Sequence, residues 1–184
     1  EVTLMKGKGK LLLTGKLDLA ILLAPLSSDL LETSPLYDET LCLCMPRNHL
    51  LAEIYGREGV ILHLLKGEPL ILYKPEQRMR QATDAILSEA GIEPKAVLES
   101  TAAATLLNLV SEGMGCAFLP RSVVEYEHIP KELVSFSLQG APLSSVFAWR
   151  KEQTPNGVVR DFIRTAENFF GDARWSGKKC SLAS

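Results

Sequence analysis

The sequence predicts an α/β fold, and two features of its apolar pattern indicate it. Short apolar runs of strand length recur, such as KLDLAILLA at 16–24 and CAFLP at 116–120. Nearly continuous runs of this kind are typical of strands buried on both faces. Segments with apolar residues three and four positions apart, the spacing of one helix face, lie between several of these runs. This alternation predicts largely parallel sheets covered by helices.

The first part of the chain contains a short helical turn and three predicted strands. LLLTG forms the turn, which ends at Gly15. The run 16–24 is the first strand, and ETLCLCMP at 39–46 is the second, because it alternates and stops at a proline. A turn around HLLKGEP precedes the third strand, Leu70 to Tyr73.

The clearest predicted helix lies in PEQRMRQATDAILSEAGIEP at 75–94. Gly91 ends it and Pro94 follows, which is the usual order at a helix C-terminus. Its apolar stripe consists of Met79, Ala82, Ile86, Leu87 and Ala90.

The stretch LESTAAATLLNLVSEGMGCAFLP at 98–120 ends one strand, forms a helix and begins another strand. KAVLES is the strand before the helix, and we expect Thr101 to cap that helix, which ends at Gly113. The predicted inward residues of the helix are Leu106, Leu109 and Val110.

The last part of the chain contains two alternating strands, LVSFSL and SSVFAWR, and a helix at 156–170. The helix carries Val159, Phe162, Ile163, Ala166, Phe169 and Phe170 on one side. The tail at 171–184 lacks periodicity, so we expect it to be loosely ordered or derived from an expression vector.

Composition excludes several classes of protein. The 184 residues, 46% hydrophobic and 23% charged, suit one domain or two small ones. The net charge of −2 gives no basic footprint for nucleic acid. No apolar run is long enough for a membrane span, and the N-terminus has no signal-peptide pattern.

The four cysteines are Cys42, Cys44, Cys116 and Cys180, without a CxxC pair. Cys42 and Cys44 are two positions apart in a strand and therefore point to the same face. A metal pair is one interpretation, but buried thiols in a reduced, cytoplasmic protein are the commoner one. We expect no metal, no cofactor and no catalysis, since no nucleophile elbow, zinc-binding helix or phosphate loop is present.

Five motifs in order resemble the effector-binding domain of LysR-type transcriptional regulators. They are GKLDLAIL at 15–22, SPLYDETLCLCMPRNHLLA at 34–52, VILHLLKGEPLILY at 60–73, AILSEAGIEP at 85–94 and LLNLVSEGMGCAFLP at 106–120. The resemblance covers about residues 11 to 170.

The resemblance implies a fold like that of type-2 periplasmic binding proteins. Two α/β subdomains are then joined by two crossover strands, with the effector in a cleft between them. Residues 1–69 and 139–170 form subdomain I, and 70–138 form subdomain II. The crossovers are expected near Leu65 to Pro69 and near Leu138 to Pro142.

Two departures from the family pattern concern the start of the chain. Family domains open with a strand and a helix before the region that resembles EVTL, and the segment from Gly7 to Gly15 is about one turn short. Subdomain I is therefore rearranged, completed by another chain, or cut from a longer protein. The family's DNA-binding winged helix-turn-helix is also absent, so we do not expect this chain to read DNA alone.

Ser100 and Thr101 are the first candidates for effector contact. They lie where a strand ends and a helix begins, which is where α/β folds bind ligands. Free amides and the helix dipole there favour a carboxylate or a phosphate. The alternative is capping alone, worth about 1 kcal/mol. The family often places a ligand-contacting threonine at the position that matches Thr101.

The resemblance adds five further candidates. Leu23 and Ala24 end the strand of the opposing subdomain, and their apolar character favours an apolar or aromatic part of the effector. Tyr73, Lys74 and Arg78 lie in a loop that often lines the cleft, where Lys74 or Arg78 can pair with an anion. The alternative for these two cations is a solvated helix start.

The predicted function is therefore sensing of a small organic or aromatic acid by a regulatory domain. Effector binding favours one of two arrangements, and the family implies a homodimer. The alternatives are an extracytoplasmic solute-binding protein of a transporter and an enzyme on the same fold.

Overall fold

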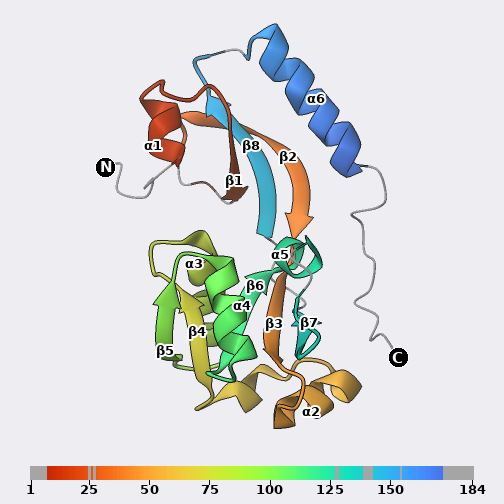
Figure 1. The fold of residues 1–184 in the computed structure, drawn as a ribbon. Coiled ribbons are helices and arrows are strands. Elements are labelled where there is room, and N and C mark those ends of the chain that lie inside the picture. Colours follow the sequence, from red (N-terminus) through yellow and green to blue (C-terminus); the bar gives the residue numbers. More distant parts are fainter. Residues whose placement is uncertain are drawn as a thin grey trace. The chain divides into compact units, whose positions relative to one another are not determined.

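The computed structural model describes residues 8–24, 26, 28–126, 129–138, 143–153 and 155–171. The chain divides into two compact units (Figure 1), a first unit of residues 1–38 and 143–184 and a second unit of 39–142. Among the described residues, no helix has both the length and the apolarity that a membrane crossing requires.

The first unit contains a three-stranded sheet in the order β1-β8-β2. β1 pairs antiparallel with β8, with Ala20 opposite Ala148 and Ala24 opposite Ser144. Its elements are α1 (Lys8–Leu13), β1 (Ala20–Ala24), β2 (Leu31–Glu39), β8 (Leu143–Arg150) and α6 (Gly157–Gly171).

Two apolar clusters hold the first unit together. One contains Leu12 of α1 with Ala20, Leu31 and Ala148, and the other contains Ile163 of α6 with Leu36 and Phe147. Arg150 also donates from Nη1 to the Leu12 carbonyl at 2.6 Å. Both helices are therefore fixed to the sheet by side chains of β8.

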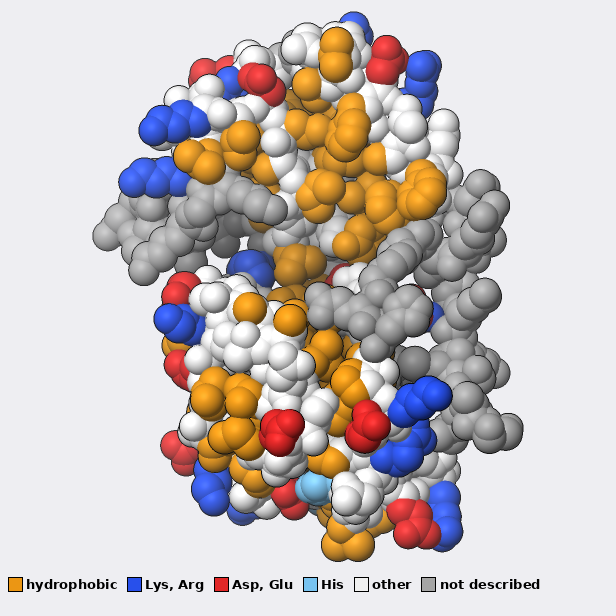
Figure 2. Space-filling view, viewed as in Figure 1, with side chains coloured by type: hydrophobic (Ala, Val, Ile, Leu, Met, Phe, Trp, Pro, Cys, Tyr) orange, Lys and Arg blue, Asp and Glu red, His pale blue; other side chains and the backbone are white. Residues whose placement is uncertain are grey.

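Only part of the apolar stripe of α6 is buried. Ile163 is buried, whereas Phe162 and Phe169, which the apolar spacing assigns to the same side of the helix, are 55% and 67% exposed. Figure 2 shows apolar side chains gathered on the surface of this unit. The stripe is wider than the area that packs on the sheet, because a period of 3.6 spreads six apolar residues over more than one face.

The second unit contains a five-stranded mixed sheet in the order β5-β4-β6-β3-β7. β4 pairs parallel with β5 and β6, whereas β3 pairs antiparallel with β6 and β7. Its elements are β3 (Leu41–Pro46), α2 (Leu50–Glu58), the 3₁₀ helix η1 (Leu62–Leu65), β4 (Pro69–Tyr73), α3 (Arg78–Glu89), β5 (Lys95–Ser100), α4 (Ala103–Ser111), β6 (Cys116–Pro120), α5 (Arg121–Tyr126) and β7 (Leu133–Ser137).

The α/β prediction is confirmed, but the expectation of largely parallel sheets is wrong outside β5, β4 and β6. β3 runs against both of its neighbours, and β1 runs against β8. The strand β2 and the helices α2 and α5 were not expected. β2 has few buried residues and gains its order from the sheet rather than from an apolar run.

The division between the units differs from the expected boundary at residue 69. β3 is fully buried from Leu41 to Met45 and pairs with β6 and β7, in the sheet that also contains β4. Residues 39–69 therefore belong to the second unit. The expected return near Leu138 to Pro142 falls at the other boundary, where 139–142 lie outside the described residues. The tail after Gly171 also lies outside them.

Glu39 anchors the start of the second unit. The residue is 5% exposed, and its Oε1 accepts from the amides of Thr40 at 3.0 Å and Ser122 at 3.2 Å. Its Oε2 accepts from the Ser122 hydroxyl at 2.5 Å. The carboxylate thereby joins the entry into β3 to the first turn of α5.

Gly115 allows β6 to lie close to β4. Its φ is +155°, and a Cβ atom there lies 2.3 Å from the carbonyl oxygen of Pro69. Only glycine fits without displacing backbone.

Gly115→Ala is expected to lower the free energy of unfolding by about 3 kcal/mol, because backbone must move to admit the methyl group. Gly56→Ala is the matched control, since Gly56 lies inside α2 with open space around it; it should stabilise by up to about 1 kcal/mol. Urea unfolding of both variants measures the difference. Equal stabilities would contradict the close approach.

Glu39→Gln is expected to cost about 1 to 3 kcal/mol, because a carboxylate that accepts three hydrogen bonds is replaced by a weaker acceptor that also brings donors. Glu89→Gln at the exposed end of α3 should change stability by less than about 0.5 kcal/mol. Chemical denaturation of the two variants checks this, and a cost at Glu39 no larger than at Glu89 would refute it.

The thiols of Cys42, Cys44 and Cys116 are fully buried. Burial raises the pKa of Cys116 to about 12, and the charge of Glu68 adds to the effect. The folded pKa lies above the ordinary value of about 8.5, so folding favours the neutral thiol. This contribution is present below the unfolded pKa and is lost as the pH rises towards 12.

We therefore expect Cys116 to resist iodoacetamide at pH 8 in the folded protein and to react after unfolding in urea. Peptide mass mapping before and after denaturation checks this at all three buried cysteines. Rapid native labelling of Cys116 would contradict the burial.

Candidate functional site

Three helices of the second unit begin where the parallel strands β4, β5 and β6 end. α3 follows β4, α4 follows β5 and α5 follows β6. Because these strands are parallel, their carboxyl ends meet at one edge of the sheet. Tyr73 and Ser100 are opposite each other at this edge, and the amide of Lys74 donates to the carbonyl of Ser100 at 3.1 Å.

α4 begins without a side-chain cap, and the predicted cap at Thr101 is wrong. The N-cap residue is Ala102, with φ −108° and ψ 125°, and the first intrahelical bond joins the Leu106 amide to its carbonyl. The Ser100 hydroxyl accepts from the Ala102 amide at 3.2 Å. The helix therefore begins one residue later than expected, and Thr101 precedes the cap. The first amides inside α4 have no intrahelical partner.

α3 also begins without a side-chain cap, at Gln77. The Gln77 side chain instead donates from Nε2 to the carbonyl of Thr101 at 3.1 Å. Its Oε1 is buried and has no hydrogen-bond partner among the described residues. The Gln77 side chain therefore holds the starts of α3 and α4 together. It does not cap either helix, so the terminal amides of both helices keep no side-chain partner.

α5 differs from these two helices, because Glu39 supplies a carboxylate at its first turn. The carboxylate accepts from both the amide and the hydroxyl of Ser122. The edge thus contains one helix start that already holds a carboxylate from the chain itself, and two that have no side-chain cap.

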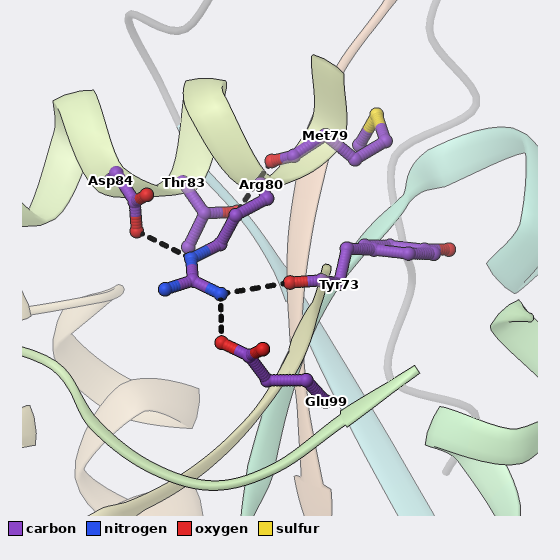
Figure 3. Close-up of polar contacts among 6 residues, drawn as sticks. All are labelled: Tyr73, Met79, Arg80, Thr83, Asp84 and Glu99. Carbon is purple, nitrogen blue, oxygen red and sulfur yellow. Dashed lines mark hydrogen bonds and ion pairs between the residues drawn. The ribbon is translucent and has the colours of Figure 1, made fainter. Parts of the chain in front are cut away.

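Positive charge accompanies the α3 start. Lys74 is exposed, and Arg78 is half-buried with Nη1 donating to Gln81 Oε1 at 2.9 Å. Arg80 donates from Nε to Asp84 Oδ1 at 2.8 Å and from Nη1 to the Tyr73 carbonyl at 2.9 Å and to Glu99 (Figure 3).

The pKa of the Arg80 guanidinium reflects these carboxylates. Burial lowers it, but the hydrogen bonds and charges of Glu99 and Asp84 outweigh burial, so that the pKa is raised above its ordinary value. Arg80 is therefore permanently cationic, and its charge is shared between two carboxylates.

Five of the seven predicted site residues lie together at this edge. They are Ser100, Thr101, Tyr73, Lys74 and Arg78.

The other two predicted residues, Leu23 and Ala24, belong to β1 of the first unit and are half-buried. The side chain of Tyr73 is 6% exposed, so it contributes to the core of the second unit. Its carbonyl contributes to the edge through the bond from Arg80.

Three polar residues of this edge were not predicted. Arg80 and Glu99 are 19 positions apart, and Glu39 is far in sequence from the helix it caps. The one local signal is the i,i+4 spacing of Arg80 and Asp84. That spacing is common on solvated helix faces, which explains why it did not single out Arg80.

His49 lies apart from this edge, at the start of α2. His49 Nδ1 accepts from the Leu51 amide at the start of α2, and Nε2 lies 3.4 Å from Glu68 Oε2. In the described ranges, no three His, Cys, Asp or Glu residues are grouped as metal ligands. Cys42 and Cys44 share a face of β3, as predicted, opposite Ser137 and Ser135.

Comparison with known proteins gives matches over most of the chain. A family model described as the LysR substrate binding domain matches residues 9–170. The hydrogen peroxide-inducible genes activator of Dickeya chrysanthemi is 32% identical over 116 residues, which are 63% of this chain and 37% of that protein. The chain spans half or less of the length of that relative and of the regulator AlsR of Bacillus subtilis.

Solved structures show the same fold. The regulatory domain of Synechocystis PCC6803 CcmR, in complex with 2-PG, has a TM-score of 0.79 at 17% identity and covers 89% of this chain and 78% of its own. The effector binding domain of QuiR, in complex with shikimate, has a TM-score of 0.74 at 21% identity, over 88% and 76%. Both likenesses concern the type-2 periplasmic-binding-like fold. With the family model matching residues 9–170, the chain belongs to the LysR substrate-binding domain family.

Proposed function

We propose that the second unit binds the carboxylate of a small organic or aromatic acid at the starts of α3 and α4. The chain is an effector-sensing domain of a transcriptional regulator, and this proposal names the chemistry that it senses. The observation that carries it is the contrast at one edge: α5 holds the Glu39 carboxylate, whereas α3 and α4 have no side-chain cap.

The physical argument rests on the amides of two neighbouring helix ends. Each helix start presents N–H groups without intrahelical partners and the positive end of the helix dipole. Lys74 and Arg78 add positive charge at the α3 start. An anion that reaches both starts gains charge-assisted hydrogen bonds. Ser100 and Thr101 supply hydroxyls at the same place.

We further propose that Leu23 and Ala24 of the first unit contact the apolar part of the effector. Both are half-buried apolar residues of β1. The effector then favours one arrangement of the two units, and this difference in affinity is what couples binding to regulation. CcmR and QuiR, which have this fold, carry 2-PG and shikimate in their structures, which supports a small acidic effector here.

The whole protein is proposed to act in the cytoplasm as a homodimer without catalytic activity. It is proposed to contact DNA through a winged helix-turn-helix outside this chain. Curated relatives are transcriptional regulators of which this chain spans half or less. A transport role is not favoured, because the matches are to regulators.

A thermal-shift screen of the chain against shikimate, benzoate, salicylate, lactate and amino acids tests the proposal. A bound acid raises the melting temperature by mass action. At least one acid should raise it in proportion to the logarithm of concentration. An unchanged melting temperature across the whole set would contradict the proposal.

Thr101→Val then tests the position of the site. It should weaken the binding of the active acid by about 1 to 2 kcal/mol, which is roughly five- to thirtyfold in Kd. Thr165→Val is the control, because Thr165 lies on α6 and donates to the Asp161 carbonyl. Titration calorimetry of both variants gives the comparison. Wild-type affinity in Thr101→Val would remove this side chain from the site.

A further inference from the structure

Arg80 connects three parts of the second unit next to the proposed effector site. Figure 3 shows its guanidinium between α3 and the ends of β4 and β5. It bonds Asp84 on its own helix, the carbonyl of Tyr73 at the end of β4, and the carboxylate of Glu99 on β5. The side chain of Arg80 is only 12% exposed. The two hydrogen bonds of Nη1 therefore reach the strand ends, and the hydrogen bond of Nε stays within α3.

Glu99 places a negative charge next to the proposed effector site. It immediately precedes Ser100, and its side chain is 36% exposed. Without an ion-pair partner, the negative charge of Glu99 would weaken the binding of an anion at the starts of α3 and α4, because like charges repel. Arg80 holds that carboxylate in an ion pair, at 2.5 Å between Nη1 and Oε1.

The same guanidinium nitrogen also fixes the backbone. Nη1 donates to both the Tyr73 carbonyl and Glu99. Tyr73 and Glu99 immediately precede Lys74 and Ser100, and the Lys74 amide donates to the Ser100 carbonyl. The position of the Glu99 carboxylate is thereby tied to the strand ends that carry the effector site.

We propose that Arg80 is a positioning residue that makes the site selective for anions. It acts through Glu99: it holds and neutralises this carboxylate, so that the starts of α3 and α4 prefer a carboxylate ligand over its uncharged amide. The inference rests on the proposed function, since it concerns the same site. If the ion pair of Arg80 with Glu99 were only structural, removing Arg80 would lower the affinity for charged and uncharged ligands equally. A larger loss for the charged ligand indicates the positioning role.

The test measures affinity for matched acid and amide probes by titration calorimetry. Each acid of the thermal-shift screen is paired with its own amide, such as benzoate with benzamide or shikimate with shikimamide, and the pair whose acid binds the wild-type chain is used. Arg80→Met should lower the affinity for the acid by about fivefold or more and the affinity for the amide by less than about twofold. Arg80→Lys, which keeps the charge, should retain most of the preference for the acid.

A second substitution identifies Glu99 as the residue through which Arg80 acts. Adding Glu99→Gln to Arg80→Met should restore the affinity for the acid to within about twofold of wild type, since the opposing charge is gone. Arg57→Met is the matched control, because Arg57 forms an exposed i,i+4 pair with Glu53 on α2. It should leave both affinities unchanged.

The outcomes distinguish this inference from the proposed function. If none of the acids binds the wild-type chain, the proposed function fails and the inference fails with it. If an acid binds but Arg80→Met lowers acid and amide affinity equally, or Glu99→Gln restores nothing, only the inference is overturned. Should Arg80→Met fail to melt cooperatively, Glu99→Gln alone decides: it should raise the preference for the acid at least about twofold, and an unchanged preference overturns the inference.

Discussion

The parallel pairing of β4 with β5 and β6 is the constraint on which the candidate site depends. Parallel strands place their carboxyl ends at one edge, and each strand here is followed by a helix. Three helix starts consequently meet at that edge, each with amides that the helix itself cannot satisfy. The register that places Tyr73 opposite Ser100 decides which residues of the loops become neighbours.

Two features support this sheet, one at each end of its parallel strands: Gly115 lies at the amino end of β6, and Glu39 lies beside the helix that follows β6. Gly115 lets β6 approach β4 at Pro69, where any side chain would collide with backbone. Glu39 satisfies the start of α5 from a buried position at the beginning of the unit. The start of α5 therefore already holds a carboxylate of the chain itself. Gln77 links the start of α3 to the turn before α4, and Arg80 links α3 to the end of β4.

Most of the second unit was predictable from sequence, for a physical reason. The strands KAVLES and CAFLP have the predicted bounds. CAFLP is almost wholly buried, and a short apolar run between turn residues has few other ways to be buried. KAVLES is the edge strand of the sheet, and none of its residues is fully buried. β2 escaped prediction, since four of its nine residues are exposed and its order comes from a partner more than 100 positions away.

Thr83 is 1% exposed although polar, because its hydroxyl donates to the Met79 carbonyl within α3.

The residues of the candidate site were predictable in part. Ser100 and Thr101 follow from a strand end and a helix start, which are local signals, whereas Lys74 followed from the resemblance to the LysR family. The prediction that Thr101 caps α4 was wrong because the helix begins one residue later, at the N-cap Ala102. The sequence does not show that Ala102, rather than Thr101, adopts the extended backbone angles of the N-cap. Arg80 and Glu99 become partners only once β4 and β5 are paired. An ion pair such as Arg80 with Glu99 depends on the register between β4 and β5. That register is set by the packing of the two strands and cannot be read from the spacing of residues in the sequence.

The most direct test of the central claim is a titration of the ¹⁵N-labelled chain with small organic acids, followed by amide chemical shifts. The account predicts that an acid which binds produces saturating shifts at the amides of 78–80 and 100–105, the starts of α3 and α4. The amides of Arg121 and Ser122 should move little, because Glu39 already satisfies that helix start. Saturating shifts confined to other regions, with those at 78–80 and 100–105 unchanged, would contradict it.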